Sequence, residues 1–199
     1  MAQGHRAFAA VWDRQTRREP KRVKALRKRV AAGATGRVLE VGVGVGTNWE
    51  FLPPAVQYTG IEPDEYMLRR AKARAAKEGR EFDLQPFDVQ QLPFDANTFD
   101  TVFSTATFCS VPDAGKGLAE VHRVLKHGGQ FRFSEHVRSA NPAYARVQRL
   151  LQPITRRFGG GCEHDRDTMS AVRAAGFKVE ELAAQRIMGI PIVTGVARK

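Results

Sequence analysis

The sequence lacks the features that mark membrane, secreted and disulfide-stabilised proteins. No apolar run approaches the roughly 20 residues that a membrane-spanning helix needs. The first residues, MAQGHRAFAAVWDRQ, contain neither the apolar core nor the small-residue cleavage site of a secretory signal. Only two cysteines occur, Cys109 and Cys162, and they show neither metal-ligand spacing nor a disulfide framework. We therefore expect a cytoplasmic protein without a metal site.

Aromatic residues are also few, and the charge is unevenly placed. Of the net charge of +11, residues 1–37 carry +9, with eleven Lys and Arg against two acids, so the rest of the chain is nearly neutral. Aromatics make up only 9% of the chain, and none are interleaved with the basic run as in an RNA-stacking platform. Binding to nucleic acid is therefore not favoured, although phosphate contacts remain an alternative.

The basic run itself predicts a helix from Arg17 to Val30, with Pro20 in its first turn. Val23 and Leu26 would pack this helix against the domain. A second interpretation is weak contact of residues 17–30 with anionic membranes, which attract basic residues near their surface. The favoured interpretation is a basic helical segment over residues 1–35 that covers a site in the domain formed by residues 36–199.

The 199 residues fit one domain, and 42% hydrophobic and 27% charged residues exclude a disordered or fibrous class. Short apolar runs alternate with helical patterns, which favours an α/β fold with a parallel sheet covered on both faces. The predicted strands are Arg37–Val41, Gln57–Ile61, Glu81–Gln85, Thr98–Ser104, Gln130–His136, Phe177–Leu182 and Ile190–Ala197. The predicted helices are Asp64–Lys77, Ala114–Leu125, which should stop at His127-Gly128-Gly129, and Thr168–Ala175.

Residues 139–165 interrupt this alternation. They contain Pro142, Pro153 and three successive glycines at 159–161, with a helical pattern only over Ala143–Leu151. We expect this stretch to be an insertion that helps to shape a binding site.

The strongest motif is a glycine-rich turn after the first strand. Gly42, Gly44 and Gly46 alternate with valines, and Glu40 lies two residues before the first glycine. Glycines allow the backbone to turn tightly and to approach a ligand. A dinucleotide-binding G-x-G-x-x-G motif that starts at Gly42 would place its third glycine at Thr47, so that class is not favoured. The alternative is an ordinary tight turn.

Two further carboxylates follow the next two strands. Glu62 lies at the end of the second strand, 20 residues after Gly42, and can accept hydrogen bonds from two ribose hydroxyls. Its alternative role is to cap a helix, but Asp64 and Glu65 are better placed for that. Asp88 follows the third strand, where it could bind a ligand or simply form a turn.

The E-x-G-x-G-x-G turn resembles motif I of class I S-adenosylmethionine-dependent methyltransferases. The segment Phe87–Phe94 is similar to the G-D-A-x-x-L-P-F segment of a subfamily that includes ubiquinone/menaquinone methyltransferases, and the similarity continues through residues 97–102 and 120–129. The resemblance implies a Rossmann-like, doubly wound seven-stranded sheet, mostly parallel with one antiparallel strand near the C-terminus. It also implies S-adenosylmethionine as cofactor, with Glu62 standing where the family more often has Asp. The residues that it implies at the cofactor are Glu40, Gly42, Gly44, Gly46, Asn48, Glu62, Pro63, Asp88, Val89 and Thr105.

Three tripeptides are similar to a narrower group, which includes methyltransferases of alkyl thiols and, nearby, phospholipid N-methyltransferases. They start at Cys109, Glu135 and Gly160. Relatives of the thiol group have an apolar N-terminal membrane anchor, whereas this N-terminus is basic. The segment Phe8–Arg14 looks like the F-x-x-x-Y-D-x opening of families whose N-terminal helices form a lid, which would place Phe8 and Trp12 over the cofactor.

The sequence therefore predicts transfer of a methyl group to a small thiol, amine or hydroxyl acceptor. In-line displacement from a sulfonium depends mainly on positioning. His136, Glu135 and His164 are the candidate catalytic residues, because histidine can act as a base near neutral pH. The alternatives are a nucleic-acid or lipid-headgroup methyltransferase that uses the basic N-terminal arm, and a noncatalytic S-adenosylmethionine-binding module.

Overall fold

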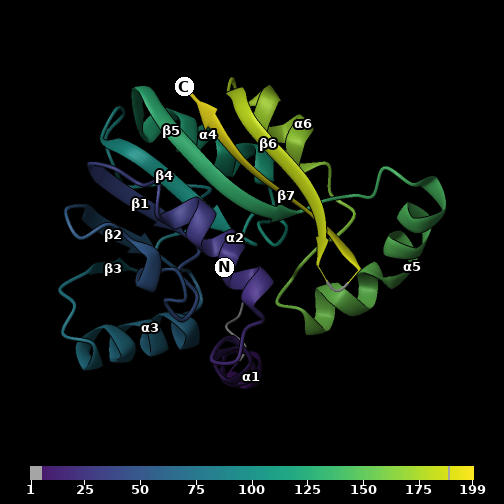
Figure 1. Cartoon of the computed structure of the whole chain (residues 1–199), viewed down its shortest axis with the longest axis horizontal. Coiled ribbons are helices and arrows are strands. Elements are labelled where there is room, and N and C mark those ends of the chain that lie inside the picture. The colour runs from purple at the N-terminus through teal and green to yellow at the C-terminus, as the bar shows by residue number, and fades with distance from the viewer. Residues whose placement is uncertain (1–5, 188) are drawn as a thin grey trace.

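The computed structural model of the chain describes residues 6–187 and 189–199, and its centre is one seven-stranded sheet (Figure 1). The strand order is β3-β2-β1-β4-β5-β7-β6. Strands β1 to β5 pair in parallel, and β7 runs antiparallel to both of its neighbours. The predicted fold class is confirmed. The strands are β1 (Arg37–Val41), β2 (Gln57–Ile61), β3 (Asp83–Gln85), β4 (Phe99–Thr105), β5 (Leu125–His136), β6 (Lys178–Ile187) and β7 (Ile190–Arg198).

The order of the strands fixes where a ligand can bind. From β1 the chain winds outward to β2 and β3, and it then returns to β4 on the other side of β1. Helical connections leave the sheet in opposite directions at this reversal, which opens a crevice beyond the carboxyl ends of β1 and β4. The glycine turn that follows β1 lies at this point.

Helices cover both faces of the sheet. One apolar cluster joins the central strands to α4 and α6, and a second joins the opposite face to α2 and α3. Figure 1 shows α2 in front of the sheet and α4 behind it, with α5 projecting to one side. The helices are α1 (Arg6–Thr16), α2 (Lys21–Ala31), α3 (Glu65–Lys77), α4 (Ala114–Val124), α5 (Pro142–Phe158) and α6 (Thr168–Ala174), with a short 3-10 turn η1 (Trp49–Phe51).

The N-terminal segment differs from the sequence prediction. The helix predicted to start at Arg17 starts at Lys21, and Pro20 is its N-cap residue instead of lying in its first turn. The proline ring disfavours the helical conformation of the preceding residue, so α1 and α2 are separate. Helix α2 packs on the sheet, where Arg132 Nε donates to Val30 O at 2.8 Å. The part of the segment before Arg6 lies outside the described residues.

The boundaries of five other elements were also predicted wrongly, namely those of α4, β5, β3, β6 and α5. Helix α4 ends at Val124 and not at the glycines, because Leu125 already pairs with Phe99 of β4 and residues 127–129 form an irregularity within β5. Strand β3 is shorter than predicted, and β6 is longer because it pairs with β7 up to Ile187. Helix α5 continues past Leu151 to Phe158 and accommodates Pro153, which is exposed. No described helix combines the length and the apolar character needed to cross a bilayer.

Candidate functional site

The glycine turn after β1 has a backbone that requires glycine. Gly42, Gly44 and Gly46 have φ angles of 74°, 58° and 81°, a region that side chains disfavour. A Cβ atom on Gly42 would lie 2.4 Å from Thr107 Oγ1, and one on Gly46 would lie 2.5 Å from the Trp49 ring. Gly44 differs, because a Cβ there would meet only Trp12 Nε1, at 3.8 Å. The middle glycine therefore faces an open space that α1 covers.

Glu62 connects the tip of β2 to this turn. Its Oε2 accepts a hydrogen bond from Gly44 N at 2.9 Å, and its Oε1 accepts one from Asp64 N at 3.0 Å. The side chain is almost fully buried, and burial raises the pKa of Glu62 to about 7. Asp64 caps α3 by accepting from the backbone of Tyr66 and Met67, so Glu62 is not needed as a cap. Each oxygen of Glu62 keeps a free lone pair for a hydroxyl donor.

Glu40 is held inside the protein behind the turn. Asn48 Nδ2 donates to Glu40 Oε1 at 2.6 Å, and the Tyr58 hydroxyl donates to Oε2. Complete burial raises the pKa of Glu40 to about 7. Asn48 also donates to Thr105 Oγ1 at 3.0 Å, so Glu40 fixes the turn of β1 to the end of β4 through Asn48. This geometry makes Glu40 a positioning residue at the predicted site.

Arg27 joins the same network, and sequence analysis missed it. Arg27 lies within the basic run predicted as a helix, but it is only 7% exposed and its guanidinium pairs with Glu19 at 2.7 Å. Its Nη1 donates to Asn48 Oδ1 at 3.2 Å and to Thr105 Oγ1 at 2.9 Å. The sequence signal that could have indicated a buried arginine was Glu19, because it is one of only two acids in the basic segment and is a possible ion-pair partner.

The remaining predicted cofactor residues lie after β2 and β3. Asp88 is partly buried and accepts from Gln90 N at 2.9 Å, so it shapes the loop after β3. Val89 is buried in the core, and Pro63 is exposed between Glu62 and Asp64. The turn after β1, Glu62 and Asp88 thus follow three adjacent parallel strands.

Comparison with known proteins identifies the family. A family model described as a methyltransferase domain matches residues 39–133. Phosphatidylethanolamine N-methyltransferase of Cereibacter sphaeroides is 33% identical over 138 residues, covering 67% of this chain and 68% of that protein. Human thiol S-methyltransferase TMT1B is 32% identical over 162 residues, covering 77% of this chain and 65% of that protein. The chain belongs to the class I S-adenosylmethionine-dependent methyltransferases.

This confirms the family and the cofactor that the glycine motif predicted. The methyltransferase spans less than two thirds of the length of the thiol S-methyltransferases that it matches. A solved S-adenosylmethionine-dependent methyltransferase from Aquifex aeolicus has the same fold, with a TM-score of 0.70 at 16% identity over 99% of this chain and 100% of that one. The open space at Gly44 and the unpaired lone pairs of Glu62 fit the cofactor of this family.

In the methyltransferase, Glu135 organises the loop that follows β4. Ser104 Oγ donates to Glu135 Oε1 at 2.8 Å, and the backbone N of Thr107 donates to the same oxygen at 3.1 Å. Cys109 N donates to Oε2 at 3.4 Å, and burial raises the pKa of the carboxyl. Ala106 lies in this loop with φ of 52°, so the contacts hold a strained backbone. These contacts support a positioning role for Glu135 rather than direct catalysis.

His136 lies at the end of β5 beside both cysteines. Its Nδ1 is 3.5 Å from Cys109 Sγ and 3.4 Å from Cys162 Sγ, and the two sulfurs are 3.1 Å apart. The His164 ring lies against His136, with centroids 4.9 Å apart, and burial lowers the pKa of His164. The structure thus brings together two of the three predicted catalytic residues and both cysteines. Sequence spacing did not reveal this cluster, because the cysteines are 53 residues apart.

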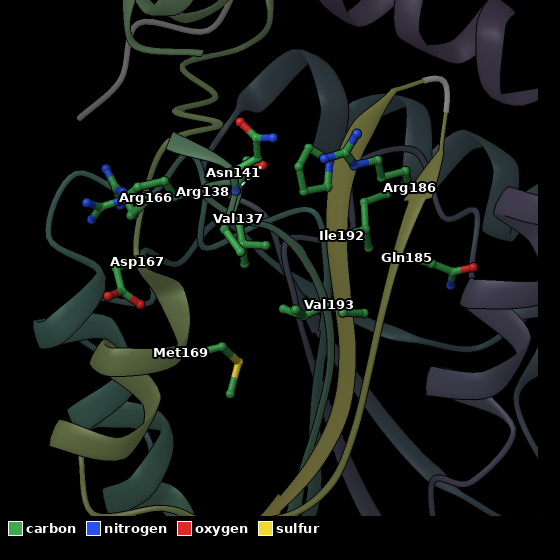
Figure 2. Close-up of a pocket in the computed structure, with 14 residues that line it drawn as sticks. Val137, Arg138, Asn141, Arg166, Asp167, Met169, Gln185, Arg186, Ile192 and Val193 are labelled. Atoms are coloured by element: carbon green, nitrogen blue, oxygen red, sulfur yellow. Dashed lines mark hydrogen bonds between the residues drawn. The ribbon is translucent and has the colours of Figure 1, made fainter. Parts of the chain in front are cut away.

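A cavity of about 610 Å³ opens beside this cluster (Figure 2). It begins at Val137, directly after His136, and Met169 and Val193 give it an apolar wall. Figure 2 shows Arg138 and Arg166 on one side and Arg186 on the other. None of the predicted cofactor residues lines it, so it is separate from the glycine turn.

Helix α1 covers the glycine turn. Trp12 and Phe8 stack on each other and pack with Val45 and Met67. Asp13 pairs with Arg70 of α3 at 3.0 Å. A Cβ on Gly160 would lie 2.6 Å from the Phe8 ring, so α1 also contacts the segment predicted as an insertion.

Proposed function

We propose that this methyltransferase moves a methyl group from S-adenosylmethionine to the sulfur of a small thiol. The similarity to thiol S-methyltransferases over about three quarters of the chain supports this acceptor class more than any other observation. The tripeptides at Cys109, Glu135 and Gly160, which suggested the same group, meet around His136 in the structure. A small acceptor is compatible with a site closed by α1 and residues 139–165.

The cofactor would be held by the tips of the first three strands. Gly44 would present its backbone to the ligand, and Glu62 would accept hydrogen bonds from the two ribose hydroxyls. Asp88 would accept from the adenine amino group, beside the Val89 backbone. Glu40, Asn48 and Thr105 would keep the turn in place through their hydrogen bonds to one another and to Arg27. Trp12 would cover the bound molecule.

Catalysis would come mainly from orientation. Bound S-adenosylmethionine supplies a methyl group activated by the positive charge of its sulfonium. The chain has to hold the acceptor sulfur in line with that methyl group, at roughly 3–3.5 Å from it. Glu135 would hold the loop after β4 in the shape that this requires, and α1 would exclude water.

A thiol acceptor must lose its proton before or during transfer. Burial lowers the pKa of His164, so this imidazole is neutral at neutral pH and can accept a proton. His136, the other histidine predicted as a base, lies against it but has its Nδ1 beside the two cysteine sulfurs, so His164 is the better candidate. We expect His164→Gln to lower kcat with little change in KM for the thiol, and the loss should shrink as the pH approaches the pKa of the acceptor thiol.

The experiment is methyl transfer from S-adenosylmethionine to a panel of small alkyl thiols, amines and phenols, with products identified by mass spectrometry. Thiol methylation should exceed methylation of the other classes. Binding of S-adenosylhomocysteine, measured by calorimetry, should weaken roughly tenfold or more in Glu62→Ala and in Asp88→Ala. Asp95→Ala is the matched control, because Asp95 is an exposed acid on a neighbouring loop.

Wild-type affinity in both variants would remove Glu62 and Asp88 from the site. Silence of the wild-type protein across the panel, with intact cofactor binding, would favour a noncatalytic binding module.

A second candidate is methylation of a lipid headgroup amine. The similarity to phosphatidylethanolamine N-methyltransferase supports it, together with the basic residues 17–30, which could contact an anionic membrane. Methylated phosphatidylethanolamine from vesicles, without thioether products, would favour this function. The proposed cytoplasmic location stays a prediction, and nothing in the described residues favours nucleic acid.

A further inference from the structure

The cluster of Cys109, His136 and Cys162 has the composition of a metal site. One donor atom of each residue lies within 4.8 Å of the others, and no other residue of the described ranges, 6–187 and 189–199, joins this group. Thiolate and imidazole are the ligands that zinc and similar ions prefer. Both cysteines are buried and free.

The distances are close to those of a tetrahedral site. Zinc with bonds of about 2.3 Å to sulfur and about 2.0 Å to nitrogen has sulfur–nitrogen edges of about 3.5 Å and a sulfur–sulfur edge of about 3.8 Å. The sulfur–nitrogen distances here are 3.4 and 3.5 Å. The sulfurs, 3.1 Å apart, would have to separate by roughly 0.7 Å, which small side-chain rotations can provide.

The surrounding backbone holds the three residues together without the metal. Glu163 N donates to Cys109 O at 2.8 Å, next to Cys162. Arg166 donates to Phe108 O at 3.0 Å, and Thr168 Oγ1 donates to His136 O at 3.4 Å. These contacts fix the backbone at and beside the three residues, and so limit where their side chains can lie.

We propose that Cys109, His136 and Cys162 bind one zinc ion, with a non-protein ligand in the fourth position. Binding would release the two thiol protons to solvent and change no oxidation state. Two thiolates would balance the charge of the ion, which suits a buried site. The site does not depend on the proposed methyl acceptor.

The test is metal analysis of the full chain, purified without an affinity tag of histidines and loaded anaerobically with zinc. We expect about one ion per chain, and cobalt loading should give thiolate-to-cobalt charge-transfer and tetrahedral d–d bands. Cys162→Ser and His136→Gln should lose most of the bound metal, whereas the exposed His127→Gln should retain it. Circular dichroism checks that each variant is folded. If one ligand variant does not fold, Cys109→Ser replaces it in the metal analysis.

Absence of stoichiometric metal after loading would overturn the site, as would equal metal content in the ligand variants. Thiol titration under denaturing conditions should find two free thiols in the metal-free protein. A Cys109–Cys162 disulfide in the freshly purified protein would also overturn the proposal.

Helix α5 carries a second, independent inference, because its polar side faces the protein. Gln148 is buried, and its Oε1 accepts from Ser139 N at 2.7 Å. Its Nε2 donates to Val137 O at 3.1 Å and to His164 O at 2.8 Å. The contacts that attach α5 at this point are therefore hydrogen bonds and not an apolar face.

The apolar side of α5 faces away from the protein. Of the large hydrophobic side chains that are exposed in the described residues, most lie on this one helix. Spacings of three and four residues place them on one stripe. They are Val147, Leu150, Leu151, Ile154 and Phe158, with exposures of 44%, 77%, 48%, 57% and 72%.

Exposed arginines accompany this stripe, and the helix has no acid. They are Arg146, Arg149, Arg156 and Arg157. An apolar stripe beside basic residues is typical of a helix that lies in the interface of a membrane, where the arginines meet anionic headgroups. We infer that α5 docks on an anionic lipid surface.

The test is flotation of the full chain with vesicles of phosphatidylcholine, with and without phosphatidylglycerol. Binding should require the anionic lipid and weaken with salt. The double variant Leu150→Ser/Ile154→Ser should bind at least tenfold more weakly. Leu182→Ser is the matched control, because Leu182 is 46% exposed on β6 and should bind as the wild type does.

Arg149→Glu/Arg156→Glu should weaken binding with the stripe intact, which separates the charge of α5 from that of residues 17–30. Wild-type binding in both double variants would overturn the inference. A second result would also overturn the membrane inference. If the wild type does not bind vesicles but self-associates in ultracentrifugation, and Leu150→Ser/Ile154→Ser abolishes that self-association, the apolar stripe contacts a second copy of the chain.

Discussion

At the scale of single residues, three buried glutamates lie near the ends of three strands and have different partners. Glu40 is saturated by Asn48 and Tyr58, and Glu135 by the loop after β4. Glu62 accepts only backbone donors and keeps capacity for a ligand. Burial raises the pKa of all three, because the loss of hydration outweighs the hydrogen bonds that stabilise the charged carboxylates.

The raised pKa of Glu62 predicts how stability depends on pH. Its pKa is 4.5 in the unfolded chain and about 7 in the folded one, so the folded chain binds more protons between these values. The contribution of Glu62 to the free energy of unfolding is therefore fully present below pH 4.5 and is lost as the pH rises through about 7. We expect Glu62→Gln to be more stable than the wild type at about pH 8, by on the order of 1–3 kcal/mol, but not at about pH 4. Urea unfolding of both proteins at both pH values measures this effect. The same stability difference between Glu62→Gln and the wild type at the two pH values would contradict the prediction.

Arg27 is the residue whose loss should cost the most stability in the N-terminal segment. Arg27→Met would leave Glu19 without its buried partner and remove two hydrogen bonds to the site network. Breaking a buried ion pair costs about 3–5 kcal/mol, and this pair is about one tenth exposed. Lys28→Met changes the exposed neighbour and should shift the unfolding free energy by less than about 0.5 kcal/mol. Equal effects of the two variants in urea unfolding would contradict this role of Arg27 as a buried ion-pair partner.

At the scale of elements, the N-terminal helices have separate tasks. Helix α2 belongs to the layer that covers the sheet, whereas α1 lies over the glycine turn and contacts α3 and Gly160. We propose the lid role for α1, since its Trp12 faces the open side of Gly44. The ion pair between Asp13 and Arg70 would hold the closed position.

Truncation of Trp12 tests this role of α1. Trp12→Ala should weaken binding of S-adenosylhomocysteine by roughly 3- to 10-fold in calorimetry, because the turn loses its apolar cover. Val11→Ala is the control, since Val11 is 54% exposed on the same helix and should bind normally. Equal affinity of both variants would show that α1 does not cover the cofactor.

At the scale of the whole molecule, the strand order places the turn of β1 next to the loops after β2 and β4. Each loop is short and fixed by partly buried hydrogen bonds to its neighbours. A ligand that bridges these loops would bind the folded chain and not the unfolded one. Its binding therefore stabilises the entire domain.

S-adenosylhomocysteine should raise the melting temperature of the full chain. At 100 times its dissociation constant the gain is about 2.7 kcal/mol, which corresponds to roughly 5–10 °C for a domain of this size. NAD at the same concentration should have no effect, because the glycine spacing does not fit a dinucleotide. Differential scanning calorimetry distinguishes the two, and equal shifts would contradict the cofactor site.

The sequence alone determined the family, the alternation of strands and helices, and the residues of the glycine turn. These features depend on local physics: buried strands need continuous apolar runs, and positive φ angles need glycine. The positions of Glu62 and Asp88 could also be predicted, because the carboxyl ends of parallel strands share one edge.

Only the tertiary structure revealed the inward turn of Arg27, the cluster of Cys109, His136 and Cys162, and the outward apolar stripe of α5. Each depends on which side of an element faces the protein, or on contacts between residues far apart in the chain. A basic helix has the same periodicity whether one arginine is buried or exposed, and two cysteines 53 residues apart meet only because the segment that carries Cys162 returns to the end of β5. Long-range packing, which no local pattern encodes, decided these three features.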